Sequence, residues 1–236
     1  MGIKEMIDAD SVNVKLALID LDGTVVDEKI NNTFDFLREY LRYRYGVIGI
    51  ARYKLAVILT SLLSKVIRNE VFLRKLFITL CTAGLNVKDL VKYAIKCWIP
   101  YILSNVNVDV LNFLRSLKHE GYTLIMLTSY IEVPAMLISN RLGFKGCIAT
   151  RLRLFGPLIL GISEDTYGPL KFESARRLLG RKQVQQAVYV ADSASIAIEK
   201  ASLYVNKVYY VNKKHCCDGT VSPNCKFFDH ELALTN

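Results

Sequence analysis

Continuous apolar runs alternate with helical patterns along much of the chain. Parallel strands that are buried on both faces typically have uninterrupted apolar sequences of this kind. Three such runs predict buried strands, at residues 16–19, 122–127 and 187–191. Two shorter runs, at residues 203–205 and 208–211, predict additional short strands.

Helical periodicity fills most of the intervals between these runs. Residues 108–120 place their apolar side chains on one face of a helix that ends at Gly121. Three further helices are predicted over residues 134–142, 170–179 and 193–200. A hairpin is predicted within residues 147–162, where Gly156 and Pro157 interrupt two strand-like segments. Because strands otherwise alternate with helices, we predict an α/β protein in which a parallel sheet lies between two helical layers.

One long segment between the first two predicted strands shows no strand pattern. Residues 32–106 lack period-two alternation, so they predict three to five helices. The helix-breaking residues of this segment are Gly46, Gly49, Gly84 and Pro100. We predict that residues 29–106 form an all-helical domain, the helical insertion. Residues 1–28 and 107–236 then form the core domain.

The helical insertion carries the positive charge of the chain. The formal net charge is +9, and residues 29–105 alone contain 13 Lys and Arg against 4 Asp and Glu. A field of this sign attracts anions, such as a phosphorylated metabolite or an acidic membrane surface. Basic and aromatic residues also alternate over residues 40–45, a pattern that can stack on nucleic-acid bases. No second feature supports this interpretation, and we expect no nucleic-acid partner.

Residues 55–64 of the insertion carry no charge and are flanked by Arg52, Lys54 and Lys65. This stretch is too short to span a bilayer, which needs about 20 apolar residues. We therefore expect it to form a buried helix of the insertion. The less favoured alternative is contact with a membrane surface, which basic residues and aromatic side chains such as Trp98 would suit.

Composition indicates a protein with its own hydrophobic core. The chain has 236 residues, of which 52% are hydrophobic. The first residues show no signal-peptide pattern, so we expect a cytoplasmic protein. Its six cysteines are irregularly spaced, which is typical of reduced thiols. A zinc site at Cys216, Cys217 and Cys225 is a less favoured alternative to free thiols.

The first predicted strand ends in two carboxylates. Asp20 and Asp22 follow the apolar run and precede Gly23, where the backbone can turn sharply, and Thr24, whose hydroxyl can bind a phosphate oxygen. Ligands of open α/β sheets bind just beyond the carboxyl ends of the strands. Two such close carboxylates raise the cost of ionising each other, which a hard divalent cation would relieve. These residues therefore predict a reaction centre.

The sequence from Asp20 to Thr24 resembles the DxDGT motif of the haloacid dehalogenase superfamily. The resemblance implies a Rossmann-like core in which Asp20 is the nucleophile and forms an aspartyl-phosphate. It implies that Asp22 is the general acid and base. Superfamily members that transport ions or cleave carbon–halogen bonds lack this second aspartate. The motif therefore favours a phosphatase or a mutase.

Four further residues match later motifs of the superfamily. Thr128 and Ser129, at the end of the second predicted strand, match residues that hold a phosphate oxygen. Lys171 matches a lysine that offsets negative charge around the phosphoryl group, and Asp192 matches a metal-binding aspartate. The implied magnesium ligands are Asp20, Asp22 and Asp192. Of these, Asp20 and Asp192 would contact the metal through their side chains.

The hairpin before Lys171 and the position of the helical insertion resemble the phosphoserine phosphatase-like branch, which carries a helical cap. The chain departs from the superfamily at two positions of the fourth motif. Ile196 stands where a second acidic residue is usual, and Ala191 stands in place of glycine. A carboxylate in the outer shell of a metal typically changes affinity or activity by about 10- to 100-fold, so Ile196 would weaken the metal site.

The resemblance implies a magnesium-dependent phosphomonoester hydrolase. It would act through an aspartyl-phosphate on a small phosphorylated metabolite. Two alternatives stay open. Ile196 suggests a catalytically weakened phosphate-binding or regulatory protein, and the basic, apolar insertion suggests a membrane-surface enzyme that acts on a lipid phosphate.

Overall fold

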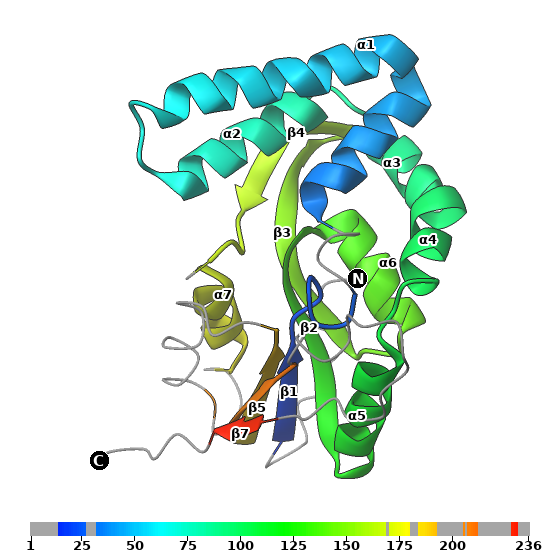
Figure 1. Cartoon of the computed structure of the whole chain (residues 1–236), viewed down its shortest axis with the longest axis vertical. Helices are drawn as coiled ribbons and strands as arrows, with labels where there is room; N and C mark the ends of the chain where they lie inside the picture. The colour runs from blue at the N-terminus through cyan, green and yellow to red at the C-terminus, as the bar shows by residue number, and fades with distance from the viewer. Residues whose placement is uncertain are drawn as a thin grey trace.

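The computed structural model contains one mixed sheet with helices on both faces (Figure 1). It describes residues 14–26, 32–168, 170–179, 184–192, 205, 207–211 and 228–230. The strands are β1 (Val14–Ile19), β2 (Tyr122–Ile131), β3 (Gly146–Phe155), β4 (Leu158–Glu164), β5 (Val184–Ala191), β6 (Lys207–Tyr210) and β7 (Phe228–His230). The helices are α1 (Thr33–Ser64), α2 (Glu70–Thr82), α3 (Val87–Tyr93), the π-helical η2 (Ala94–Trp98), α4 (Ile99–Leu103), α5 (Val108–His119), α6 (Glu132–Arg141) and α7 (Leu170–Leu179).

The sheet has the strand order β4-β3-β2-β1-β5-β6-β7. Its central strands, from β3 to β6, are parallel, and β4 and β7 are antiparallel edge strands. Strand β1 lies between β2 and β5, and Ile19 pairs with both Met126 and Val190. The carboxyl ends of these three strands therefore meet at one edge of the sheet.

The side chains of β1 alternate between two hydrophobic layers. Ala17 and Ile19 belong to one buried cluster, and Leu16 and Leu18 belong to the other. Helix α7 covers the second cluster with Phe172, whereas α5 and α6 cover the first. This arrangement confirms the predicted three-layer α/β fold.

Most of the predicted elements are present at nearly the predicted positions. The helix over residues 170–179 is α7, and the hairpin is formed by β3 and β4. Strand β2 continues four residues beyond its predicted end at Leu127, because Tyr130 and Ile131 are buried in the core. The helix predicted over residues 193–200 lies outside the described residues.

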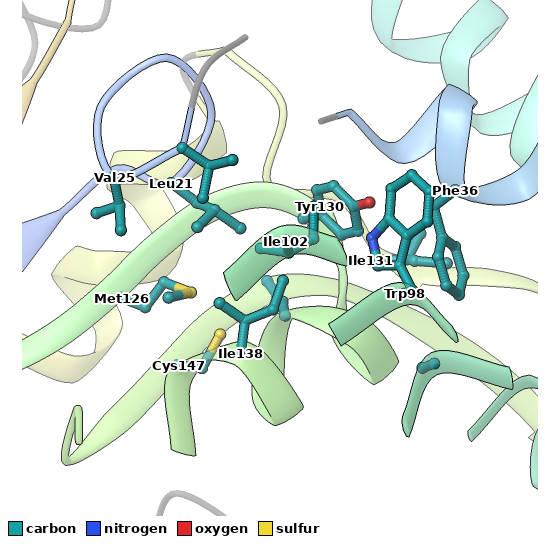
Figure 2. Close-up of a cluster of buried hydrophobic side chains, with 14 of the residues drawn as sticks. Leu21, Val25, Phe36, Trp98, Ile102, Met126, Tyr130, Ile131, Ile138 and Cys147 are labelled. Carbon is teal, nitrogen blue, oxygen red and sulfur yellow. The ribbon is translucent and has the colours of Figure 1, made fainter. Parts of the chain in front are cut away.

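The helices α1 to α4 and η2 all lie between β1 and β2 in the sequence. Figure 2 shows Phe36 of α1 and Trp98 of η2 packed beside Tyr130 of β2. The ring centroid of Phe36 lies 5.4 Å from that of Trp98 and 6.2 Å from that of Tyr130. The hydrophobic core of the sheet therefore continues into the helical insertion.

Backbone hydrogen bonds also join the insertion to the β3–β4 hairpin. The Gly84 N–H donates to the Ile159 carbonyl at 2.8 Å, and the Ile159 N–H donates to the Leu85 carbonyl at 2.9 Å. The Val87 N–H donates to the Pro157 carbonyl at 2.8 Å. The hairpin thus anchors the insertion at a point remote from its two chain connections. The division into two domains stays a prediction.

Helix α1 bends sharply at Gly46, where φ is 58°. The bend brings Gly49 against the preceding turn, and a Cβ at Gly49 would lie 2.0 Å from the Leu41 carbonyl oxygen. We expect Gly49→Ala to destabilise the protein by about 1–3 kcal/mol, because the clash is with backbone. Urea unfolding measures this change, with Ser61→Ala on the exposed part of α1 as a control. Equal stability of the two variants would contradict the predicted clash.

The expectation that residues 55–64 form a buried helix is wrong. They belong to the second half of α1, in which Ile58 is 54% and Leu62 is 55% exposed. Only one side of this half faces α2, so Ala56 is its one buried residue after Gly49. Of the helices in the described part of the chain, α1 alone is long and apolar enough to cross a membrane, with a mean hydropathy of 1.6 over its best window.

Candidate active site

Asp20 is the first residue after β1, and its carboxylate is held from two sides. The Leu21 N–H donates to Oδ1 at 2.8 Å. The Lys171 ammonium donates to Oδ2 at 2.7 Å, and the Tyr189 hydroxyl lies 3.4 Å from the same oxygen. Lys171 is buried at the beginning of α7, so the fold brings this cation to Asp20 across 151 positions of sequence. The sequence analysis predicted that both residues belong to one site.

Asp22 lies in the tight loop that follows β1. The Gly23 N–H donates to the Val26 carbonyl at 2.7 Å, and the Val25 N–H donates to the Leu21 carbonyl at 3.0 Å. The Oδ1 atom of Asp22 is inaccessible to solvent and has no hydrogen-bond partner among the described residues. Burial, and then repulsion from Asp20, raises the pKa of the Asp22 carboxyl well above its usual range. A carboxyl of this kind keeps its proton and can donate it.

The raised pKa of Asp22 makes the stability of the protein depend on pH. The folded state holds the proton more tightly than the unfolded state, so stability falls as the pH rises from the unfolded pKa of about 4 towards the folded pKa. Asp22→Asn removes this loss. We expect the variant to be more stable than the wild type at about pH 7, with a smaller advantage at about pH 4.

Thermal unfolding of the metal-free protein at both pH values measures this difference. Asp109→Asn, which changes an exposed carboxylate of α5, is the matched control and should show no such gain. A variant of Asp22 that is less stable than the wild type at neutral pH would show that the ionised carboxylate is stabilising.

Thr24, Thr128 and Ser129 are the predicted phosphate-binding residues besides Lys171. The Thr24 hydroxyl is buried and has no hydrogen-bond partner among the described residues. The Thr128 hydroxyl accepts a hydrogen bond from the Tyr130 N–H at 3.1 Å. The Ser129 carbonyl oxygen lies 3.1 Å from the Thr150 hydroxyl oxygen. Contact of these three residues with phosphate stays a prediction.

Asp192 directly follows β5, the strand next to β1. Its charge and that of Asp20 both act on the carboxyl of Asp22, and both raise the pKa of that carboxyl. The three carboxylates therefore gather at the edge where β1 and β5 end. Ile196, which departs from the superfamily pattern, lies outside the described residues.

The carboxylates at this edge suit a magnesium ion. Among the described residues, no three His, Cys, Asp or Glu side chains form a recognisable metal-binding group. Mg²⁺ in proteins is commonly held by one or two carboxylates and several waters. Asp20 and Asp192 can supply those carboxylates, and the unpartnered Oδ1 of Asp22 is a further acceptor beside them. The residues present therefore fit this ion.

A buried ion pair lies beside the site and was not predicted from the sequence. Arg74 of α2 donates from Nη1 to Oδ1 of Asp165 and from Nη2 to the Ser129 carbonyl. Thr150 donates to the same Asp165 oxygen at 3.1 Å, and the Tyr167 N–H donates to it at 3.1 Å. Burial lowers the pKa of Arg74. The positive charge of Arg74 offsets part of the rise in the pKa of Asp22. The helical insertion therefore supplies a cation to the edge of the sheet where Asp20 and Asp22 lie.

A zinc site at Cys216, Cys217 and Cys225 cannot be compared with the structure, because these residues lie outside the described part of the chain. Cys81, Cys97 and Cys147 are free thiols. Burial raises the pKa of Cys81 to about 12, so this thiol is inert at neutral pH.

A comparison with protein-family models decides the family. The model of the haloacid dehalogenase-like hydrolases matches residues 17–195, which include Asp20, Asp22, Lys171 and Asp192. The chain belongs to this family. The superfamily resemblance of the sequence is thereby confirmed. A search of curated proteins finds no match.

Several solved structures share the fold of this haloacid dehalogenase-like hydrolase. A protein of unknown function from Bordetella pertussis Tohama I has a TM-score of 0.62 at 14% identity, over 84% of this chain and 89% of that one. A substrate-bound phosphoserine phosphatase has a TM-score of 0.56 at 15% identity, over 84% and 86%. Cytosolic 5'-nucleotidase IIIB bound to cytidine has a TM-score of 0.54 at 11% identity, over 80% and 68%. At these identities, the likeness concerns the fold.

Proposed function

We propose that this haloacid dehalogenase-like hydrolase is a magnesium-dependent phosphatase that hydrolyses small phosphomonoesters. The contact between the Asp20 carboxylate and the buried Lys171 ammonium, at 2.7 Å, carries the proposal. It sets a nucleophile beside a cation that can offset the charge of a phosphoryl group. The raised pKa of Asp22 provides an acid next to that nucleophile.

In the first step, a carboxylate oxygen of Asp20 attacks phosphorus. The new O–P bond forms as the ester P–O bond breaks, and the leaving oxygen takes the proton of Asp22. In the second step, a water oxygen attacks phosphorus while Asp22 takes a proton from that water. The bond between phosphorus and Asp20 then breaks, which releases inorganic phosphate and restores both aspartates.

Lys171 and the backbone position Asp20 for this attack. Lys171 holds one carboxylate oxygen and the Leu21 N–H holds the other, so the carboxylate is fixed in one orientation. Mg²⁺ bound by Asp20 and Asp192 would offset the negative charge of the substrate. Arg74 adds positive charge from the helical insertion. This charge lowers the pKa of Asp22 and so favours the ionised form that is needed in the second step.

The direct test is hydrolysis of p-nitrophenyl phosphate with and without magnesium. We expect turnover with added Mg²⁺ and its loss after chelation with EDTA, followed by recovery when Mg²⁺ is returned. Circular dichroism with and without EDTA controls for loss of the fold. Turnover that survives chelation would contradict magnesium dependence. No turnover of any member of a panel of phosphorylated metabolites would contradict the phosphatase proposal.

A further inference from the structure

The second half of α1 exposes a continuous apolar surface, here called the α1 face. Its residues are Val47, Ile48, Leu55, Ile58, Leu62 and Val66. Val47 is 85% exposed just after the bend at Gly46, and Val66, which follows the C-cap Lys65, is 83% exposed, so the surface continues past the end of the helix. In Figure 1, α1 and α2 lie together at one extremity of the molecule, remote from α5.

The opposite side of the helix is fixed to the insertion. Ala56 is buried, and the side chain of Arg52 donates to the Leu80 carbonyl at 2.8 Å and also to the Ala83 carbonyl. Leu55, Ile58 and Leu62 are spaced by three and four residues, so they share the side that points away from these contacts. Rotation of α1 to bury them would break the bonds of Arg52. The α1 face is therefore left without a partner among the residues that the structure describes.

The charges around the α1 face have one sign. Residues 47–69, which follow the bend, contain four Lys and Arg and no Asp or Glu. Lys54 and Lys65 are exposed and lie on the side of the helix that carries Ile58. Long basic side chains beside an apolar helix face can extend their charged ends to lipid headgroups while their carbon stems cover apolar surface.

We propose that the α1 face docks on an anionic lipid bilayer, with the helix lying in the plane of the interface. Apolar side chains enter the boundary between headgroups and acyl chains, and the flanking lysines bind acidic headgroups. This inference concerns where the protein binds. It does not depend on the proposed phosphatase activity and does not make a lipid the substrate.

Two observations favour this orientation over a transmembrane helix. The first half of α1 is packed in the core through Phe36 and Tyr40, which leaves only the half after Gly46 available to lipid. That half has α2 along one side and two charged residues, Arg52 and Lys54, within it. A bilayer surface accommodates both features, whereas the hydrocarbon core does not.

Charge also favours a bilayer over a second copy of the chain. A symmetric dimer would place one α1 face against another. The basic residues of each copy would then face those of its partner, because residues 47–69 provide no carboxylate to pair with them. An acidic lipid surface provides the missing opposite charge.

Flotation of the full chain with vesicles tests the proposal. One set of vesicles contains phosphatidylcholine alone, and the other contains equal parts of phosphatidylcholine and phosphatidylserine. We expect the wild type to float with the acidic vesicles and to bind the neutral ones more weakly. Lys54→Gln/Lys65→Gln should weaken binding to acidic vesicles by roughly 25-fold, because each basic residue contributes about fivefold.

Ile58→Glu/Leu62→Glu should reduce binding to both kinds of vesicle by at least about tenfold. Val108→Glu is the matched control, because Val108 is 65% exposed at the beginning of α5. It should bind as the wild type does, and circular dichroism establishes that each variant is folded. A wild type that does not float with acidic vesicles would overturn the proposal, as would a folded Ile58→Glu/Leu62→Glu variant that binds normally.

Analytical ultracentrifugation in the absence of vesicles tests for the second copy. A monomeric wild type is the expected result. A wild-type dimer that Ile58→Glu/Leu62→Glu dissociates would overturn the proposal and assign the α1 face to self-association.

Discussion

Asp20→Asn is expected to lower the turnover of p-nitrophenyl phosphate by at least about four orders of magnitude. Loss of a covalent nucleophile typically has an effect of this size. An amide is a poor nucleophile, yet asparagine has nearly the same shape and keeps an oxygen that can accept the Leu21 N–H. The substitution therefore keeps the shape of the side chain but removes the ion pair with Lys171, so circular dichroism must show that the variant is folded.

Trapping experiments add a readout that is independent of turnover. With a labelled substrate and acid quenching, the wild type should retain label on the protein as the aspartyl-phosphate, and Asp20→Asn should retain none. Asp109→Asn, at an exposed position on α5, controls for the loss of one carboxylate and should keep both activity and label. Turnover of Asp20→Asn close to the wild-type rate would contradict the proposed mechanism.

The strands at the centre of the sheet could be predicted because burial on both faces leaves a clear pattern. Residues 16–19 and 187–191 alternate between two apolar layers, so their sequences are uniformly apolar. The end of β2 could not be predicted in the same way. Thr128 and Ser129 interrupt the apolar run, and only the contacts of the following Tyr130 and Ile131 with the core extend the strand.

The predicted burial of residues 55–64 failed for a related reason. An apolar sequence indicates that the side chains of a helix leave water. It does not specify whether they pack against the same protein or against something else. Among the described residues, α2 is the helix that packs along this part of α1, and it covers only the side of Ala56.

The residues of the candidate site that belong to sequence motifs could be predicted. Asp20 and Asp22 are two positions apart in the sequence, and strand order brings Asp192 to the same edge. Arg74 had no comparable signal, because a basic residue in a strongly basic segment resembles an ordinary solvated side chain. Its role depends on Asp165, which is 91 positions away and precedes α7 rather than ending a parallel strand.

Arg74→Met is expected to destabilise the protein by about 3–5 kcal/mol. Arg74 is 7% exposed and Asp165 is 4% exposed, so the substitution would leave a buried carboxylate without its cation. Removing one partner of a buried pair typically has a cost of this size, whereas removing both charges restores much of the stability. Arg74→Met/Asp165→Asn should therefore be more stable than Arg74→Met.

Asn at position 165 keeps an oxygen that can accept hydrogen bonds from Thr150 and the Tyr167 N–H. Urea unfolding of the wild type, the two single variants and the double variant gives the coupling free energy between the two side chains. Additive effects of the two substitutions would show that the ion pair does not stabilise the fold.

The same variants separate stability from catalysis. The positive charge of Arg74 lowers the pKa of Asp22, so its removal should raise that pKa further. The ionised form of Asp22, which takes the proton of water in the second step, would then be less populated. We expect the double variant to recover stability but to have its activity displaced to higher pH relative to the wild type. A pH–rate profile that coincides with that of the wild type would show that Arg74 only holds the helical insertion on the core and does not affect Asp22.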